Sequence, residues 1–113
     1  MTALLLSLAV AGCGGVDDDA PTATLVTTPT SAAAGATVTL IAAAISDNGI
    51  SGIQFYRVDS GTSTLLGTLN ATPYQFTTTV PASATGSVSY FATAVDAYGN
   101  TGDSDYAVVT ITN

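Results

Sequence analysis

Residues 87–100 read Ser-Val-Ser-Tyr-Phe-Ala-Thr-Ala-Val-Asp-Ala-Tyr-Gly-Asn, and this stretch decides the fold. Side chains alternate between the two faces of a β-strand, so every second residue shares a face. One face of this stretch carries Tyr90, Ala92, Ala94 and Asp96. The Tyr98-Gly99-Asn100 cluster is typical of a turn, because glycine and asparagine tolerate positive φ. The sequence therefore predicts a strand over 87–97 that buries one face and ends in a turn.

Six other stretches show short apolar or Thr-rich runs between turn clusters. These further predicted strands are 22–27, 36–45, 50–59, 64–70, 74–80 and 105–112. Pro29 follows the first of them and marks an edge or an exit, because proline has no N–H to give to a ladder. Strands spaced about 8 to 12 residues apart, with no helical periodicity after Cys13, predict one all-β sandwich domain.

Composition excludes several classes of function. The 113 residues contain no His, Lys or Glu, and the single basic residue is Arg57. Nucleophiles activated by histidine, imidazole metal sites and Schiff-base chemistry are thereby excluded. A net charge of −7 leaves no basic patch for nucleic acid. We therefore predict a protein that is not an enzyme, binds no nucleic acid and, with one cysteine, forms no internal disulfide.

The first residues are typical of an export signal. Ala3 to Ala11 form an apolar run interrupted only by Ser7, too short for the roughly 20 residues of a membrane span. The next motif, Val10-Ala11-Gly12-Cys13, resembles the lipobox of bacterial lipoprotein precursors. That resemblance implies removal of residues 1–12 and attachment of lipid, such as palmitate, to Cys13. Two or three acyl chains anchor a protein stably, whereas one holds it only marginally.

The same resemblance predicts localisation to the cell envelope: the outer membrane in a Gram-negative source, and otherwise the cell surface. A free, packed cysteine is the alternative for Cys13. Met1-Thr2 carries no Lys or Arg, whereas lipoprotein signals normally begin with positive charge. Either the true start lies upstream or export is inefficient. Residues 13–21 then combine glycines, Asp17-Asp18-Asp19 and Pro21, which is typical of an acidic tether and leaves 22–113 as the domain.

Several motifs in that domain, in their order and spacing, resemble the bacterial Ig-like domains of surface proteins and secreted glycoside hydrolases. The motifs are Ile45–Ile50, Ile53–Tyr56, Leu66–Thr68, Pro73–Phe76 and Tyr90–Asn100. The resemblance covers residues 21–113 and implies an immunoglobulin-like β-sandwich of about seven antiparallel strands. Tyr90 and Ala92 resemble the tyrosine corner and the following cysteine position of immunoglobulin strand F, with alanine replacing the cysteine.

Turn residues offer one candidate metal site. Oxygen ligands suit calcium, and such ligands occur at Asp47, Asp96, Asn100 and Asp103. The alternative is an ordinary turn in which the carboxylate accepts backbone N–H bonds. The sequence thus leaves open a weak Ca²⁺ site and predicts no other cofactor.

Two further hypotheses involve carbohydrate as a substrate or as a ligand. A pair of carboxyl groups such as those of Asp59 and Asp96 can catalyse glycoside hydrolysis. One of the two must act as a general acid, and nothing in the sequence raises a carboxyl pKa for that role. Tyr56, Tyr98 and Tyr106 are candidate exposed aromatic residues for stacking on sugars or on a protein. Ordinary surface tyrosines are the alternative.

Three functional hypotheses follow. The first is a membrane-anchored Ig-like module for binding, adhesion or spacing, whose partner is an unidentified envelope protein or polysaccharide. The second is a truncated accessory module of a secreted carbohydrate-active enzyme. The third is a structural subunit that adds an edge strand to a neighbour, which its oligomeric state in solution would reveal.

Overall fold

The computed structural model describes residues 20–112, which form strands and their connections. The strands are β1 (Thr22–Thr28), β2 (Ser31–Ala32), β3 (Thr37–Ile45), β4 (Ile50–Asp59), β5 (Thr62–Leu69), β6 (Gln75–Thr79), β7 (Ser87–Asp96), β8 (Thr101–Asp103) and β9 (Ala107–Ile111). Within this range no helix is long and apolar enough to cross a bilayer. The predicted all-β class is confirmed. The proposed signal peptide, Cys13 and the three consecutive aspartates lie outside the described residues.

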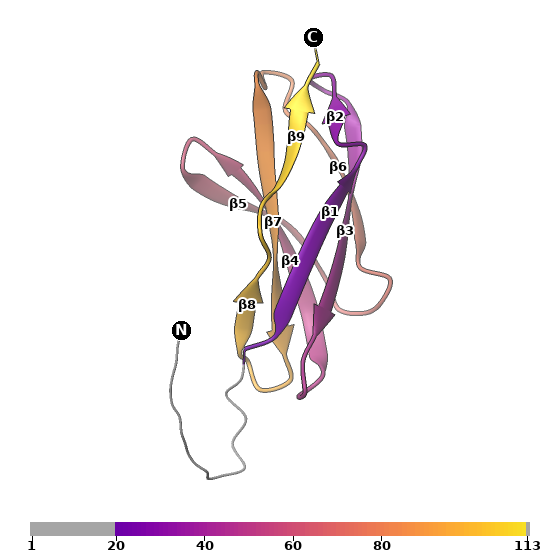
Figure 1. Ribbon diagram of the computed structural model, residues 1–113, viewed down its shortest axis with the longest axis vertical. Coiled ribbons are helices and arrows are strands. Elements are labelled where there is room, and N and C mark those ends of the chain that lie inside the picture. Colours follow the sequence, from indigo (N-terminus) through magenta and orange to yellow (C-terminus); the bar gives the residue numbers. More distant parts are fainter. Residues whose placement is uncertain (1–19, 113) are drawn as a thin grey trace.

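Two sheets pack face to face. One contains β1, β3 and β6 in that order, and the other runs β2-β9-β7-β4-β5, with β8 also paired to β7. Figure 1 shows the long strands of both sheets running along the length of the molecule. The core between the sheets is filled by large apolar side chains, of which Leu40, Ile53, Phe55 and Val109 are fully buried. Burial of each such side chain contributes about 1.5–3 kcal/mol, which suits a domain that has no internal disulfide.

The alternation predicted from the sequence places the expected residues inward. On β3 the buried positions are Val38, Leu40 and Ala42, and Ala44 packs partly buried against them. On β7 all four predicted residues, Tyr90, Ala92, Ala94 and Asp96, are buried. Side chains alternate with a period of two along each strand, so the register of paired strands places their apolar residues together on the core face of the sheet.

Two short strands, β2 and β8, are additional to the predicted seven, and the pairing of β2 is not antiparallel. After β1 pairs with β3, the chain passes Pro29 and crosses to the other sheet, where β2 pairs with β9 in parallel. Pro29 is therefore the predicted exit from the first sheet. The pairing along this edge of β7 is interrupted between β8 and β9, and there the Ser104 hydroxyl accepts the Ala92 N–H at 2.9 Å. This bond replaces a ladder bond that the interruption removes.

The sandwich has two chemically different ends. Strands β4 and β7 pair antiparallel, with Ile50 opposite Asp96 and Arg57 opposite Tyr90. The turns 46–49 and 97–100 meet at what we name the Asp96 end, the lower end in Figure 1. The turn between β4 and β5 and the loop 80–86 lie toward the opposite end, which we name the Arg57 end. The two ends hold the residues that matter for function.

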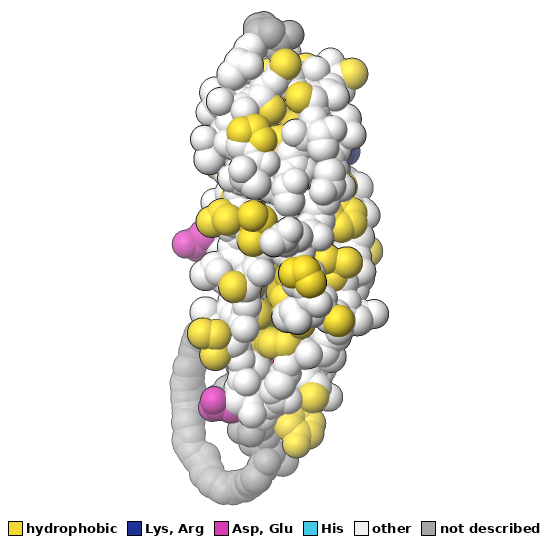
Figure 2. All heavy atoms as spheres, turned by 90° about the vertical axis from the view of Figure 1, so that its right-hand side faces the viewer, with side chains coloured by type: hydrophobic (Ala, Val, Ile, Leu, Met, Phe, Trp, Pro, Cys, Tyr) yellow, Lys and Arg dark blue, Asp and Glu magenta, His cyan; other side chains and the backbone are white. Residues whose placement is uncertain are grey.

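The outer face of the three-stranded sheet carries no charged side chain. Its outward positions are Thr22, Thr24, Val26, Thr28, Thr37, Thr39, Ile41, Ala43, Ile45, Gln75, Thr77 and Thr79. Figure 2 shows this side of the molecule, where hydrophobic side chains lie among uncharged polar ones and acidic side chains appear toward the margin. Charged groups of the described residues therefore belong to the larger sheet and to the two ends.

Candidate functional site

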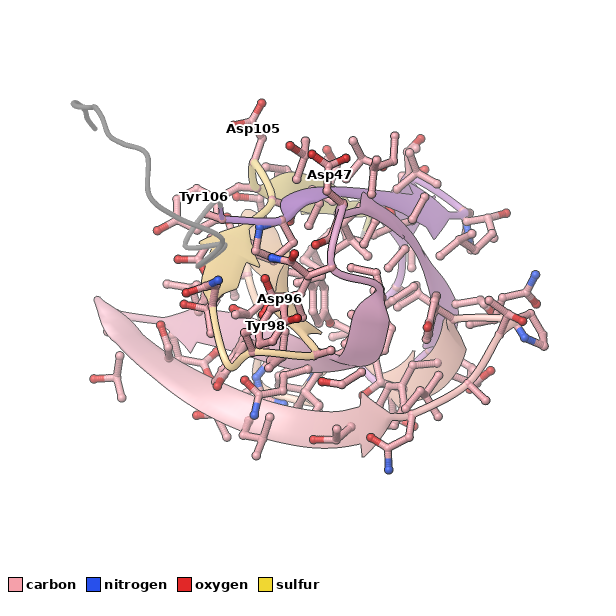
Figure 3. All side chains as sticks on the ribbon, turned by 90° about the horizontal axis from the view of Figure 1, so that it is seen from below. Asp47, Asp96, Tyr98, Asp105 and Tyr106 are labelled. Atoms are coloured by element: carbon pink, nitrogen blue, oxygen red, sulfur yellow. The ribbon has the colours of Figure 1, made fainter. Side chains whose placement is uncertain are left out.

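The Asp96 end is organised around one buried carboxylate. Asp96 is the last residue of β7 and is only 1% exposed. Its Oδ1 accepts the backbone N–H groups of Tyr98 at 2.9 Å and Asn100 at 2.8 Å. Its Oδ2 accepts the side-chain amides of Asn48 and Asn100, both at 3.0 Å. Figure 3 looks onto this end, with Asp96 near its middle. The carboxylate thus joins the turn between β3 and β4 to the turn between β7 and β8.

These four bonds control the ionisation of Asp96. Loss of solvent around the carboxyl group would by itself raise its pKa, because burial disfavours the charged form. The bonds donated by Asn48, Asn100 and Tyr98 stabilise the charged form, and the net effect lowers the pKa of Asp96 below its ordinary value. Asp96 is therefore an ionised carboxylate that holds two turns together.

The residues suggested for calcium are only partly brought together. Asn100 contacts Asp96, and Asn48, which the sequence reasoning missed, joins them. N–H donors point at both oxygens of Asp96. Asp47 is exposed, and Asp103 accepts the Thr93 hydroxyl at 2.7 Å. Across residues 20–112 no group of three Asp, Glu, His or Cys side chains could hold a metal ion. The observed bonding is that of the turn alternative, and the calcium site stays a prediction.

The carboxylates considered for glycoside hydrolysis lie at opposite ends. Asp96 is paired with Ile50, and Asp59 is the last residue of the same strand as Ile50. Nine strand residues at about 3.3 Å each separate the two carboxylates by roughly 30 Å. The paired carboxyl groups of glycosidases lie about 5–10 Å apart. This pair therefore cannot act on one glycosidic bond.

Two of the three candidate aromatic residues form a row on the outer face of the larger sheet. The Tyr56 ring stacks on Phe91, with centroids 4.8 Å apart, and the Phe91 and Tyr106 rings pack edge to face with centroids 5.9 Å apart. At the interruption between β8 and β9, Phe91, Tyr106, Asp103 and Asp105 border a shallow hollow of about 220 Å³. The sequence reasoning missed Phe91, although it is the outward residue between buried Tyr90 and Ala92.

Tyr98 lies apart from this row. It is 70% exposed in the turn of the Asp96 end, whereas Tyr106 lies farther to one side in Figure 3. The three tyrosines singled out from the sequence therefore do not make one surface.

The Arg57 end contains a larger hollow of about 440 Å³. Arg57 donates from Nε to Oδ2 of Asp59 at 2.8 Å, and both residues border this hollow together with hydroxyl-bearing residues of the segment 83–87. The sequence reasoning missed this site. Its available signal was the single arginine, two residues before an aspartate at the end of a strand.

The fold and the bonding described above define the class of the protein: an Ig-like sandwich that holds together without an internal disulfide. More particularly, the chain belongs to the bacterial Ig domain family, whose sequence profile matches residues 21–92. Members of this family are typically non-catalytic modules and are typically extracellular or surface-associated.

The fold is also similar to solved structures of other bacterial proteins. Fibronectin(III)-like modules of Clostridium thermocellum CbhA superpose with a TM-score of 0.61 at 25% identity, over 79% of this chain and 93% of theirs. Pectate lyase Pel3 of Pectobacterium carotovorum has a TM-score of 0.54 at 16% identity, over 84% of this chain. This chain spans only 28% of that enzyme, so the likeness concerns the fold alone. No curated protein sequence matches the chain significantly.

Proposed function

We propose that this chain is a lipid-anchored, non-catalytic Ig-like module that binds or spaces other components at the bacterial cell envelope. Cys13 holds it to the membrane, residues 14–21 form the tether, and the sandwich faces away from the cytoplasm. No cofactor is needed for this role.

The observation that carries the proposal is the order of the parts. A short apolar run and Val10-Ala11-Gly12-Cys13 precede the tether and a domain of a family that is typically surface-associated. The sandwich supports the non-catalytic part, because its core is filled by apolar side chains. Its carboxylates at the two ends are also too far apart to act as a pair.

Metabolic labelling with alkyne-palmitate in a bacterial host tests the anchor. We expect the wild-type chain to take up label and to sediment with membranes, and Cys13→Ser to lose both properties. Because Cys13 is the single cysteine, the double variant Ser7→Cys with Cys13→Ser keeps one thiol outside the motif and should also stay unlabelled. Label that persists in Cys13→Ser would contradict the anchor.

A second candidate function is an accessory module of a secreted carbohydrate-active enzyme. The observation that favours it is the likeness to the CbhA modules, of which this chain covers 93%. In that case the sandwich acts as a spacer or binding unit beside another domain.

An immunoblot of the native organism with antibody against the sandwich separates the two functions. A band near the chain's own 11.1 kDa supports the anchored module, with allowance for loss of the signal peptide and gain of lipid. A band several times heavier supports the accessory module.

A further inference from the structure

The guanidinium of Arg57 has unused hydrogen-bonding capacity. An arginine carries five N–H donors in a planar fork. Only Nε is bonded, to Oδ2 of Asp59, and the two terminal nitrogens have no partner among residues 20–112. The side chain as a whole is only 24% exposed, so most of it is withdrawn from water. Such donors gain more from a ligand than fully solvated ones do.

Asp59 supplies the complementary acceptor. One of its oxygens, Oδ2, receives the Arg57 bond, and no donor within the described part of the chain reaches Oδ1. The pair therefore presents free donors and a free acceptor side by side, with no net charge. The pair does not attract anions strongly, because the negative charge of Asp59 offsets the positive charge of Arg57.

The walls of the hollow fit a polar ligand with an apolar face. The hydroxyl-bearing residues Ser83, Thr85 and Ser87 border it, as do the apolar residues Pro81 and Val88. Its volume of about 440 Å³ falls in the range of about 300–1,000 Å³ that is typical of small-molecule sites.

A buried hydroxyl lies behind this wall. Tyr90 is paired with Arg57 and follows the bordering Val88 by two residues on the same face. Its phenol oxygen is buried without a hydrogen-bond partner in the described range. The Arg57 end is thus the part of the molecule where the fold leaves polar capacity unfilled.

We propose that this hollow is a binding site for a neutral saccharide. Adjacent sugar hydroxyls can accept from the terminal nitrogens of Arg57 and donate to Oδ1 of Asp59, while ring C–H groups lie against Pro81 and Val88. A net charge of −7 opposes the approach of a polyanion, whereas a neutral glycan meets no such barrier. The inference names a ligand for the binding role proposed above. It rests on the folded sandwich and not on Cys13, so palmitate labelling and saccharide binding fail independently.

The single arginine makes the test direct, because the full chain has one Arg Nε–H signal in a ¹H–¹⁵N spectrum. The probes are gluco-, xylo- and manno-configured neutral hexasaccharides and a galacturonate hexamer. We expect at least one neutral probe to shift the Arg57 Nε–H and the amides of Ser87 and Val88 saturably. No shift with any neutral probe would overturn the proposal, as would tighter binding of the galacturonate.

Variants locate the contact. Arg57→Lys keeps the charge but loses the planar fork, and Asp59→Asn loses the anionic acceptor, so each should weaken binding by about tenfold. Thr77→Ala, on the outer face of the other sheet, is the control and should bind as the wild type does. If Tyr106→Ala weakens binding while Arg57→Lys does not, the sugar lies on the aromatic row and the proposal is wrong. Amide spectra verify that each variant folds, and the wild-type titration remains decisive if one does not.

Discussion

The two ends of the sandwich use charged side chains in opposite ways. At the Asp96 end both carboxylate oxygens are taken, by four N–H donors from Asn48, Tyr98 and Asn100. At the Arg57 end the guanidinium makes one hydrogen bond within residues 20–112, and Arg57 borders a hollow. A charge with filled hydrogen bonds holds the fold, whereas a charge with unfilled ones is available to a ligand.

This difference separates structural from functional residues without any catalytic motif. The charge of Asp96 is nearly inaccessible, and its partners come from two turns that it holds in place. Arg57 and Asp59 are partly exposed and satisfy each other only in part. We therefore expect stability to depend on the first end and binding on the second.

Removing the charge of Asp96 should have the largest effect. Asp96→Asn replaces an acceptor oxygen with an NH₂ group that faces the N–H donors of the two turns, so buried donors lose their partners. We expect the midpoint of thermal unfolding, Tm, to fall by roughly 10 °C. Circular dichroism measures it, with Asp47→Asn as the matched control, since exposed Asp47 lies in one of the same turns. Equal Tm values for the two variants would contradict the structural role.

Acid should weaken the same end. The pKa of Asp96 is lower in the folded than in the unfolded chain, so its stabilising contribution is present above the ordinary aspartate pKa and is lost as the pH falls through the folded value. Below about pH 4 the wild type should therefore lose Tm more steeply than Asp96→Asn does. Thermal melts of both proteins between neutral and acidic pH test this, and parallel curves would show that Asp96 does not carry the dependence.

Sequence alone predicted much of the Asp96 end. The period of two placed Asp96 on the inward face of its strand, and the turn residues after it offered carboxylate-to-backbone bonding as the alternative to calcium. The bond from Asn48 was missed because it joins residues 48 positions apart, and only the pairing of β4 with β7 brings them together. Local patterns specify a strand and its turn, but not which distant side chain completes the bonding.

The Arg57 end was beyond sequence reasoning for a similar reason. Its hollow needs the β4–β5 turn and the segment 81–88 to meet, and only the long-range pairing of β4 with β7, which sets Val58 opposite Ser89, brings them together. The crossing of the chain at Pro29 was also only half predicted, because proline indicates where a strand ends and not which sheet the chain joins next. Both features depend on long-range pairing.

Removing the charge at the Arg57 end should change stability little. Asp59→Asn breaks an ion pair whose side chains are 24% and 42% exposed, and such pairs contribute about 0–1 kcal/mol. We expect the free energy of unfolding in urea to change by less than about 1 kcal/mol. This result would sharpen the contrast with Asp96→Asn. A loss as large as that of the Asp96 variant would mean that both ends are structural.

The smallest effect should come from Tyr90, which lies behind the wall of the hollow. Its hydroxyl is buried without a partner in the described range, unlike the hydrogen-bonded tyrosine corner that the sequence resembles. Tyr90→Phe removes a desolvated polar atom and keeps the ring, so we expect Tm to stay constant or rise by about 1–3 °C.

Alkaline pH gives this variant a second readout. Burial raises the pKa of Tyr90, Arg57 lowers it in part and Asp59 raises it slightly. The unfolded chain therefore ionises this tyrosine first, and wild-type stability should fall as the pH rises above about 10. Tyr90→Phe lacks that component, so its Tm should decline less over the same range. A lower Tm for the variant at neutral pH would instead mean that the hydroxyl is hydrogen-bonded, and the Arg57 end would then contain one unsatisfied polar group fewer.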